Sequence, residues 1–197
     1  IDWSAQFDSS TDFLVNFSGT NRALSNSQFS AQRLKDAVVD RFTEAGLSRP
    51  SVDKLAPGFT IQARLWRDKV TIGVDMAGGS LHQRGYRSET GDAPLKEHVA
   101  SALLIRSGWT KARHKPLIDP MCGSGTIAIE AAQIAMNKAP GLTRKRWGFT
   151  KWLNHDERLW QSLVEHAQHS EKTTDVKIVA NDNQPPMIQI AKRNADQ

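Results

Sequence analysis

A glycine loop between a short apolar run and an alanine-rich run constrains this chain more than any other feature. The stretch Leu117–Ala132 reads LIDPMCGSGTIAIEAA. Its apolar start predicts a buried strand that ends at Asp119, and the residues from Gly125 to Asn137 predict a helix. Glycines between a strand and a helix let a ligand approach the backbone closely. The stretch therefore predicts a ligand site in an α/β domain with a parallel sheet.

The acid at the end of the strand indicates which class of ligand the loop holds. The loop lacks the Gly-Lys-Ser/Thr ending of a phosphate-binding P-loop. A nicotinamide dinucleotide would place its pyrophosphate at the helix N-terminus, where Asp119 would repel it. S-adenosylmethionine is cationic and has no phosphate, and Asp182, at the end of the next predicted strand, can accept hydrogen bonds from ribose hydroxyls. A nicotinamide oxidoreductase remains the alternative.

The first part of the chain predicts an α+β unit. Residues 27–45 have apolar side chains at helical spacing, with Asn26 or Ser27 as a candidate cap and Gly46 as a candidate end. Phe59–Trp66 alternates apolar and polar residues and predicts a strand, and residues 70–76 complete a hairpin. Because few residues precede the helix, we expect this unit to be incomplete at its N-terminal side.

The second part predicts the beginning of a doubly wound sheet. A polar, glycine-rich stretch, residues 78–94, precedes a helix predicted to begin at Pro94 and end at Gly108. Strands are predicted at residues 116–120 and 176–182, and helices at 125–137, 156–168 and from Pro185 onward. A doubly wound sheet needs more than two strands, so we expect this domain to be truncated.

Net charge and composition bear on the partners of the chain. The net charge of +5 and the pI near 9.5 favour an anionic partner such as nucleic acid. With one cysteine, Cys122, the chain has no internal disulfide, which fits the cytoplasm. The sequence contains no long apolar run, so we expect no membrane span. Its histidines do not have the spacing of metal ligands, so we expect no bound metal.

Two basic segments are candidate RNA contacts. Residues 138–152 carry five cations and no acid, interleaved with aromatic side chains that can stack on unpaired bases. The alternative is that the tryptophans fix a long loop while the cations are solvated. The helix at residues 27–45 offers a second group of cations, for which a solvated face is the alternative. The candidate RNA-binding residues are Arg33, Lys35, Arg41, Arg144, Lys145, Arg146, Trp147 and Lys151.

Three segments together give the chain a family resemblance. LIDPMCGSGTIAIEAA, APLKEHVASALLIRSGW and APGLTRKRWGF resemble the bacterial THUMP-domain rRNA methyltransferases, in particular those that methylate guanine N2 of 23S rRNA. The resemblance covers almost the entire chain. It implies an α+β THUMP domain (ferredoxin-like-associated) at residues 1–80 and a linker and entry helix at 81–108. Residues 109–197 would form the first part of a Rossmann-like class I methyltransferase domain.

The resemblance also implies an activity and a set of site residues. The expected activity is transfer of a methyl group from S-adenosylmethionine to guanine N2 of 23S ribosomal RNA, in the cytoplasm. A non-catalytic RNA-binding fragment, or action on another RNA base, are the alternatives. The implied cofactor-binding residues are Asp119, Met121, Cys122, Gly123, Ser124, Gly125, Thr126, Asp182, Asn183, Arg87 and Pro94.

Two departures from the family pattern stand out. The second strand is followed by Asp182-Asn183-Gln184, where the family often has Asp-x-Asp, so a second carboxylate is missing. The family's catalytic loop reads Asn-Pro-Pro followed by an aromatic residue. The nearest match here, NQPP at residues 183–186, has an inserted Gln184 and is followed by Met187, and we interpret it as a helix start. The catalytic residues are therefore expected outside this chain.

Overall fold

The chain divides into two compact units. The structure, a computed structural model, describes residues 1–91 and 93–197. One unit consists of Ile1–Gly79 and Arg146–Glu157, and the other of Ser80–Lys145 and Arg158–Gln197. The first unit thus differs from the predicted domain of residues 1–80 because it includes a segment that follows the glycine loop in sequence.

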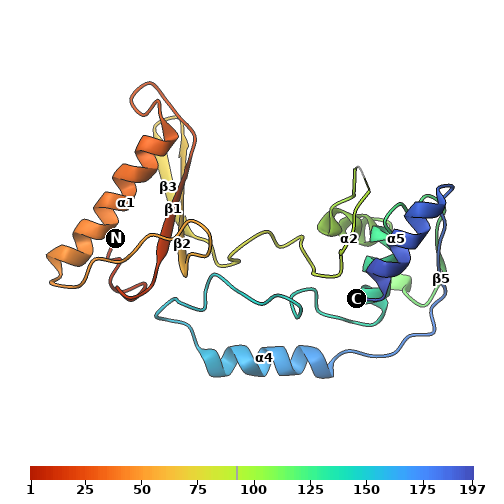
Figure 1. Cartoon of the computed structure of the whole chain (residues 1–197). Coiled ribbons are helices and arrows are strands. Elements are labelled where there is room, and N and C mark those ends of the chain that lie inside the picture. Colours follow the sequence, from red (N-terminus) through yellow and green to blue (C-terminus); the bar gives the residue numbers. More distant parts are fainter. Residues whose placement is uncertain (92) are drawn as a thin grey trace. The chain divides into compact units, whose positions relative to one another are not determined.

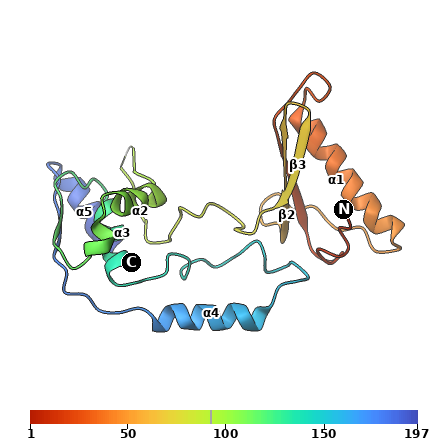
Figure 2. The same cartoon turned by 180° about the vertical axis from the view of Figure 1, so that it is seen from behind.

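The first unit is a three-stranded sheet with one helix. Its elements are β1 (Phe13–Ser18), α1 (Ser27–Glu44), β2 (Phe59–Trp66) and β3 (Lys69–Val74). The strand order is β1-β2-β3, with β1 parallel and β3 antiparallel to β2. Both views in Figure 1 and Figure 2 show α1 beside this sheet. The parallel pair requires a crossover, which α1 supplies.

Local sequence accounts for these elements. The side chain of Asn26 accepts a hydrogen bond from the backbone N–H of Phe29 at 3.0 Å, which confirms Asn26 as the cap of α1. On β2, Phe59, Ile61, Ala63 and Leu65 are buried, as the alternation predicts.

Aromatic side chains form the core of the first unit. The ring of Phe7 lies 4.5 Å from that of Phe59, 5.0 Å from that of Phe42 and 5.6 Å from that of Phe13. All four phenylalanines are fully buried. Phe29, which helical spacing placed on the same face of α1, is 60% exposed and does not join this core.

Residues 146–157 complete the first unit. The backbone N–H of Gly148 donates to the Met76 carbonyl at 3.1 Å, and that of Leu153 donates to the Gln6 carbonyl at 2.9 Å. The indole of Trp152 packs against the phenylalanine core and donates to Gln6 Oε1 at 3.0 Å. A Cβ on Gly148 would lie 2.0 Å from the Asp75 carbonyl oxygen, so only glycine fits there. This segment is therefore structural in large part.

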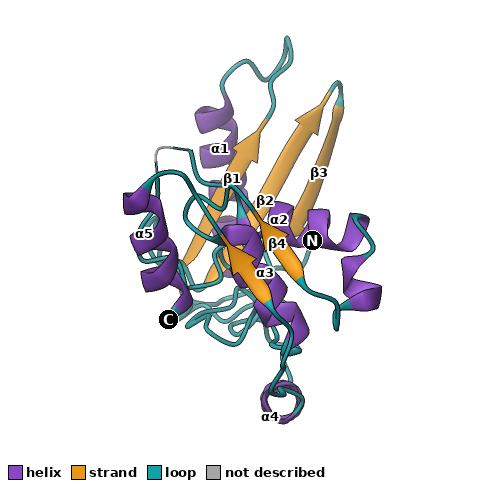
Figure 3. Ribbon diagram, turned by 90° about the vertical axis from the view of Figure 1, so that its right-hand side faces the viewer, coloured by secondary structure: helices purple, strands orange, loops and turns teal. Residues whose placement is uncertain are grey.

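The second unit holds the glycine loop. Its strands β4 (Leu117–Asp119) and β5 (Ile178–Ala180) are parallel, and α3 (Thr126–Ala135) and α5 (Pro185–Ala195) follow them. The remaining elements are α2 (Glu97–Arg106), the 3-10 helix η1 (Trp109–Ala112) and α4 (Glu157–His169), whose first residue lies in the other unit. Figure 3 shows β4 directly in front of α3.

One predicted helix start is confirmed by the structure, and another is wrong. Helix α5 begins at Pro185, which confirms NQPP as a helix start. Helix α2 begins at Glu97 and not at Pro94, so that prediction was wrong. The physical reason is that Lys96 keeps an extended conformation (φ −71°, ψ 140°) and the Leu95 carbonyl is bound by an arginine. Among the described residues, no helix has the length and apolar character needed to cross a membrane.

Candidate ligand site at the glycine loop

Hydrogen bonds from both strand ends hold the glycine loop. The backbone N–H of Cys122 donates to the Asn181 carbonyl at 2.8 Å, and that of Asn181 donates to the Asp119 carbonyl at 2.8 Å. The backbone N–H of Gly123 donates to Asp182 Oδ2 at 2.9 Å. Gly123 (φ +52°) has left-handed backbone geometry, which side chains disfavour. The loop is therefore fixed between the carboxyl ends of two parallel strands, where α/β sheets bind ligands.

A cavity of about 480 Å³ opens at this loop. A Cβ built on Gly123 would meet no protein atom within 4 Å, so the loop leaves room for a ligand beside its backbone. Two carboxylates line the cavity, and none of its described lining residues is a lysine or an arginine. The lining residues are Thr90, Gly91, Ala93, Pro94, Leu95, Asp119, Met121, Cys122, Gly123, Ser124, Thr126, Ile127, Asp182, Gln184 and Met187.

The two carboxylates are held in place by backbone donors. Asp119 is 9% exposed, and its Oδ1 accepts from the backbone N–H of Met121 at 3.2 Å. Asp182 accepts from Gly123 through Oδ2 and from the backbone N–H of Gln184 through Oδ1, both at 2.9 Å. Burial, followed by the charges of Asp119 and Asp182, raises the pKa of the Cys122 thiol. The cavity thus suits a ligand with positive charge and hydroxyl donors, and opposes a pyrophosphate.

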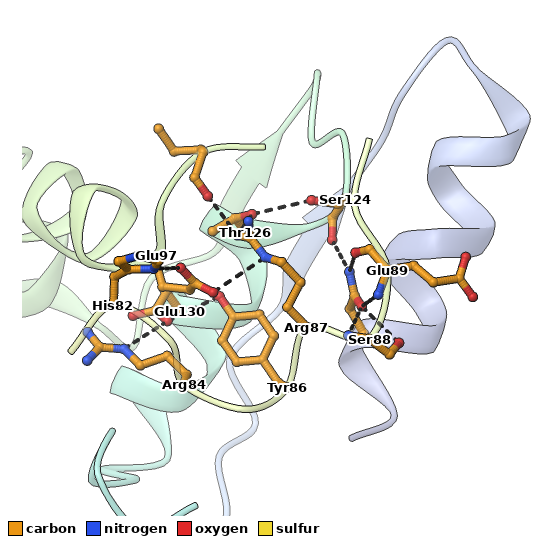
Figure 4. A network of polar contacts seen from close by, with 12 residues as sticks. His82, Arg84, Tyr86, Arg87, Ser88, Glu89, Glu97, Ser124, Thr126 and Glu130 are labelled. Carbon is orange, nitrogen blue, oxygen red and sulfur yellow. Dashed lines mark hydrogen bonds and ion pairs between the residues drawn. The ribbon is translucent and has the colours of Figure 1, made fainter. Parts of the chain in front are cut away.

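A buried polar network supports the wall behind the loop (Figure 4). Glu97 and Glu130 are 3% and 2% exposed, and each faces an arginine. Arg87 Nε lies 3.4 Å from Glu97 Oε1, and Arg84 Nε lies 3.5 Å from Glu130 Oε1. The hydroxyl of Tyr86 donates to Glu130 Oε1 at 3.2 Å. Burial, followed by the charges of Glu130 and Glu97, strongly raises the pKa of Tyr86, so this phenol stays protonated.

Arg87 joins this network to the glycine loop. Its Nη2 donates to the Leu95 carbonyl at 2.6 Å and to Thr126 Oγ1 at 2.9 Å. Leu95 and Thr126 both line the cavity, so the guanidinium links two of its walls from behind. The sequence did contain a signal for this network: Glu130 is the one charged residue of the mainly apolar helix α3, and a buried carboxylate requires a partner.

Asn194 makes a second link, from α5. Its side chain is 1% exposed. Its Oδ1 accepts from the backbone N–H groups of Ser88 and Glu89 at 3.0 and 3.2 Å and from Ser88 Oγ at 3.2 Å. Its Nδ2 donates to the carbonyls of Glu89 and Ser124, both at 3.1 Å. The side-chain amide of Asn194 therefore joins α5 to residues 88–89 and to the glycine loop. Sequence reasoning missed this residue.

The cavity brings together most of the predicted cofactor residues. Eight of them are among its lining residues: Pro94, Asp119, Met121, Cys122, Gly123, Ser124, Thr126 and Asp182. The other three do not line it, for physical reasons. Arg87 is turned to Leu95 and Thr126, Gly125 packs against Ala191 of α5, and Asn183 is exposed beside the cavity.

The predicted RNA contacts fall into two groups. On α1, Lys35 pairs with Asp36, and Arg41 pairs with Glu44 at 2.7 Å, while Arg33 is exposed. These ion pairs partly offset the charge of that face.

In the segment after α3, two of the cations bind backbone. Arg144 Nη1 donates to the Ser80 carbonyl at 2.9 Å, and Arg146 Nη2 donates to the Pro57 carbonyl. The ring of Trp147 stacks on Phe149, with centroids 5.6 Å apart. Lys145 and Lys151 are exposed. In the part of the chain that the structure describes, no group of three or more His, Cys, Asp or Glu side chains could hold a metal ion.

Family models match both parts of the chain. Residues 84–197 match the RMKL-like methyltransferase domain, and residues 1–75 match the THUMP domain. A relative from Alteromonas mediterranea called "Ribosomal RNA large subunit methyltransferase K/L" is 58% identical over 197 residues, which are 100% of this chain and 28% of that protein. The chain thus spans about 28% of the length of this curated relative.

Solved structures resemble the chain over nearly its whole length. A putative methyltransferase complexed with SAH has a TM-score of 0.87 and 32% identity, over 99% of this chain and 51% of its own. A predicted N6-adenine-specific DNA methylase from Listeria monocytogenes has a TM-score of 0.83 and 30% identity, over 99% and 51% respectively.

Proposed function

This chain belongs to the family of RMKL-like methyltransferases, and on that premise we propose that it forms the methyl-donor site of an S-adenosylmethionine-dependent RNA methyltransferase. The observation that carries the proposal is the cavity at the glycine loop. It presents two carboxylates and no described cation, and it leaves open space beside the backbone of Gly123. A relative complexed with SAH has the same fold.

The residues present fit the cofactor. S-adenosylmethionine supplies a methyl group that is already activated by its sulfonium. Asp182 would accept hydrogen bonds from ribose hydroxyls, since each of its oxygens has a second lone pair beyond the backbone N–H that it already binds. Asp119 would supply negative charge that favours an ammonium or sulfonium group. Arg87 and Asn194 act as positioning residues, because they hold the cavity walls without lining the cavity.

We propose 23S ribosomal RNA as the substrate, guanine N2 as the methylated atom and the cytoplasm as the location. The names of the curated relatives and the match to a THUMP domain support an RNA substrate. The guanine would have to leave its stack to reach the cavity. Holding the amine in line with the methyl group can supply about 7–11 kcal/mol of the barrier. The residues that contact the amine are expected outside this chain.

Calorimetric titration of S-adenosylhomocysteine into the chain tests the donor site. We expect one site, and an affinity at least about tenfold weaker in Asp119→Ala, because a loss of about 1.4 kcal/mol corresponds to one charged contact. Asp119→Asn is the matched variant, since it keeps the acceptor for Met121 and removes only the charge.

NAD titrated in the same way discriminates the ligand classes. Binding of S-adenosylhomocysteine without binding of NAD supports the proposal. If a folded sample binds NAD tightly and does not bind S-adenosylhomocysteine, the proposed methyl-donor site is wrong and the cavity is a nicotinamide site. An Asp119→Ala chain that binds S-adenosylhomocysteine as well as the unaltered chain would mean that the carboxylate has no part in recognition.

A further inference from the structure

One face of the β1-β2-β3 sheet carries polar and aromatic side chains that point away from the core. The alternation that buries Ile61, Ala63 and Leu65 directs Gln62, Arg64 and Trp66 to the opposite face. In the view of Figure 3 the three strands lie side by side with α1 behind them. The members of this outer face, all exposed, are Asn16, Ser18, Gln62, Arg64, Trp66, Lys69, Thr71 and Gly73.

Strand register clusters the cations around one indole. Arg64 lies opposite Thr71 on β3 and Ser18 on β1, and Trp66 lies opposite Lys69. Side chains directly opposite each other in a sheet have Cβ atoms about 4.5–5.5 Å apart. The guanidinium of Arg67, in the turn after β2, lies 6.0 Å from the centroid of the Trp66 ring. Arg64 and Lys69 therefore share the outer face with Trp66, and a third cation, Arg67, lies over its ring.

The indole of Trp66 is unusually exposed for a tryptophan. Trp66 is 66% exposed, although tryptophan is highly buried on average in folded proteins. A hollow of about 320 Å³ lies against it, lined by Arg64, Trp66 and Thr71. A cation, a hydroxyl and an aromatic surface thus meet around one hollow on an otherwise polar sheet.

Charge complementarity identifies the occupant. Arg64, Arg67 and Lys69 form no ion pair with any described residue, whereas Lys35 and Arg41 on α1 are paired with acids. The nearby carboxylate of Asp68 accepts from Asn21 Nδ2 at 3.2 Å. Unpaired cations beside an exposed indole match a polyanion that also presents flat rings, which is single-stranded nucleic acid.

We propose that this outer sheet face binds unpaired nucleotides of the RNA substrate. A base stacks on Trp66, and Arg64 and Lys69 contact the phosphates on either side of it. This inference rests on the proposed function, which supplies RNA as the partner. It differs from the contacts predicted on α1 and in residues 138–152, and it assigns a recognition role to residues that the methyl-donor site does not use.

Fluorescence anisotropy with a labelled single-stranded oligouridine, and with an RNA duplex as comparison, tests the proposal on the full chain. We expect tighter binding of the single strand, because duplex bases are not open to stacking. Trp66→Ala should weaken its binding about tenfold, and Trp66→Phe should retain most of it. Arg64→Ala and Lys69→Ala should each reduce the slope of log affinity against log salt by about 0.7. Arg49→Ala, an exposed cation elsewhere in the same unit, is the matched charge control.

Several outcomes would overturn the proposal. They are no binding of oligouridine by the unaltered chain, unchanged binding by Trp66→Ala, or an equal loss in Arg49→Ala. A lower thermal midpoint of Trp66→Ala would show that the indole packs on protein instead. S-adenosylhomocysteine titration into Trp66→Ala separates the two proposals. Normal cofactor binding with unchanged RNA binding refutes this inference alone, and lost cofactor binding in every chain refutes the proposed function.

Discussion

Asn194 offers the sharpest test of how the methyl-donor cavity is held together. Truncation to alanine removes five hydrogen bonds at once. The Ser124 carbonyl lies in a buried residue and would lose its side-chain partner, at a cost of about 1–3 kcal/mol. Ser88 and Glu89 are exposed, so water can replace part of the other four bonds, at about 0.5 kcal/mol each. We therefore expect Asn194→Ala to lower the free energy of unfolding by about 3–5 kcal/mol.

Urea unfolding followed by far-UV circular dichroism measures this loss, and calorimetry measures the affinity for S-adenosylhomocysteine. Affinity should fall as well, because the glycine loop loses its link to α5. Gln189→Ala is the matched control, since it removes an exposed amide from the same helix. Asn194→Asp should be about as unstable as Asn194→Ala, because it turns a carboxylate toward two carbonyls. A loss below about 1 kcal/mol in Asn194→Ala would refute the reasoning.

Three further predictions concern the loop and the segment that completes the first unit. Gly125→Ala should destabilise the chain by at least about 1–2 kcal/mol in urea unfolding, because the alanine backbone would keep φ +85° and its Cβ would lie 3.0 Å from the Cβ of Ala191. An unchanged midpoint would contradict this. Alkylation of Cys122 by iodoacetamide should show a pH midpoint above the value of about 8.5 of a free thiol. Asp182→Asn should move that midpoint down because it removes a negative charge, and an upward shift would count against the cause given. Gly148→Ala should lower the thermal midpoint of the first unit in differential scanning calorimetry, because its Cβ would overlap the Asp75 carbonyl oxygen. An unchanged or higher midpoint would contradict this expectation.

The sequence predicted those parts of the fold and site that depend on neighbours along the chain. The strand–loop–helix unit around Gly123 and the start of α5 at Pro185 follow from local backbone chemistry, and both are present. The cavity residues at the two strand ends could be found because parallel strands bring their carboxyl ends together.

The remainder depends on contacts between distant residues. Asn194 meets the Ser124 carbonyl 70 residues away, and an asparagine near the end of a helix has no local pattern that reveals such a partner. The composition of residues 138–152 could not show whether the segment contacts RNA or packs on the protein, because tryptophan and arginine side chains are used for both purposes. Strand β1 (FLVNFS) begins with three apolar residues in a row, which hides its alternation, and it was not predicted from its own sequence.

The return of residues 146–157 to the first unit has a consequence for synthesis of the protein. Ribosomes add about 5–20 residues per second. Gly79, the last residue of the first segment, precedes Glu157 by 78 residues (157 minus 79), so the nascent sheet lacks Trp152 and Gly148 for about 4–16 s at that rate. During that interval its phenylalanine core lacks the cover that Trp152 provides. The first unit thus reaches its native state only after the glycine loop has been translated. A gene fusion that exchanges residues 1–79 alone would lack Trp152 and the rest of residues 146–157, which complete the core of this unit.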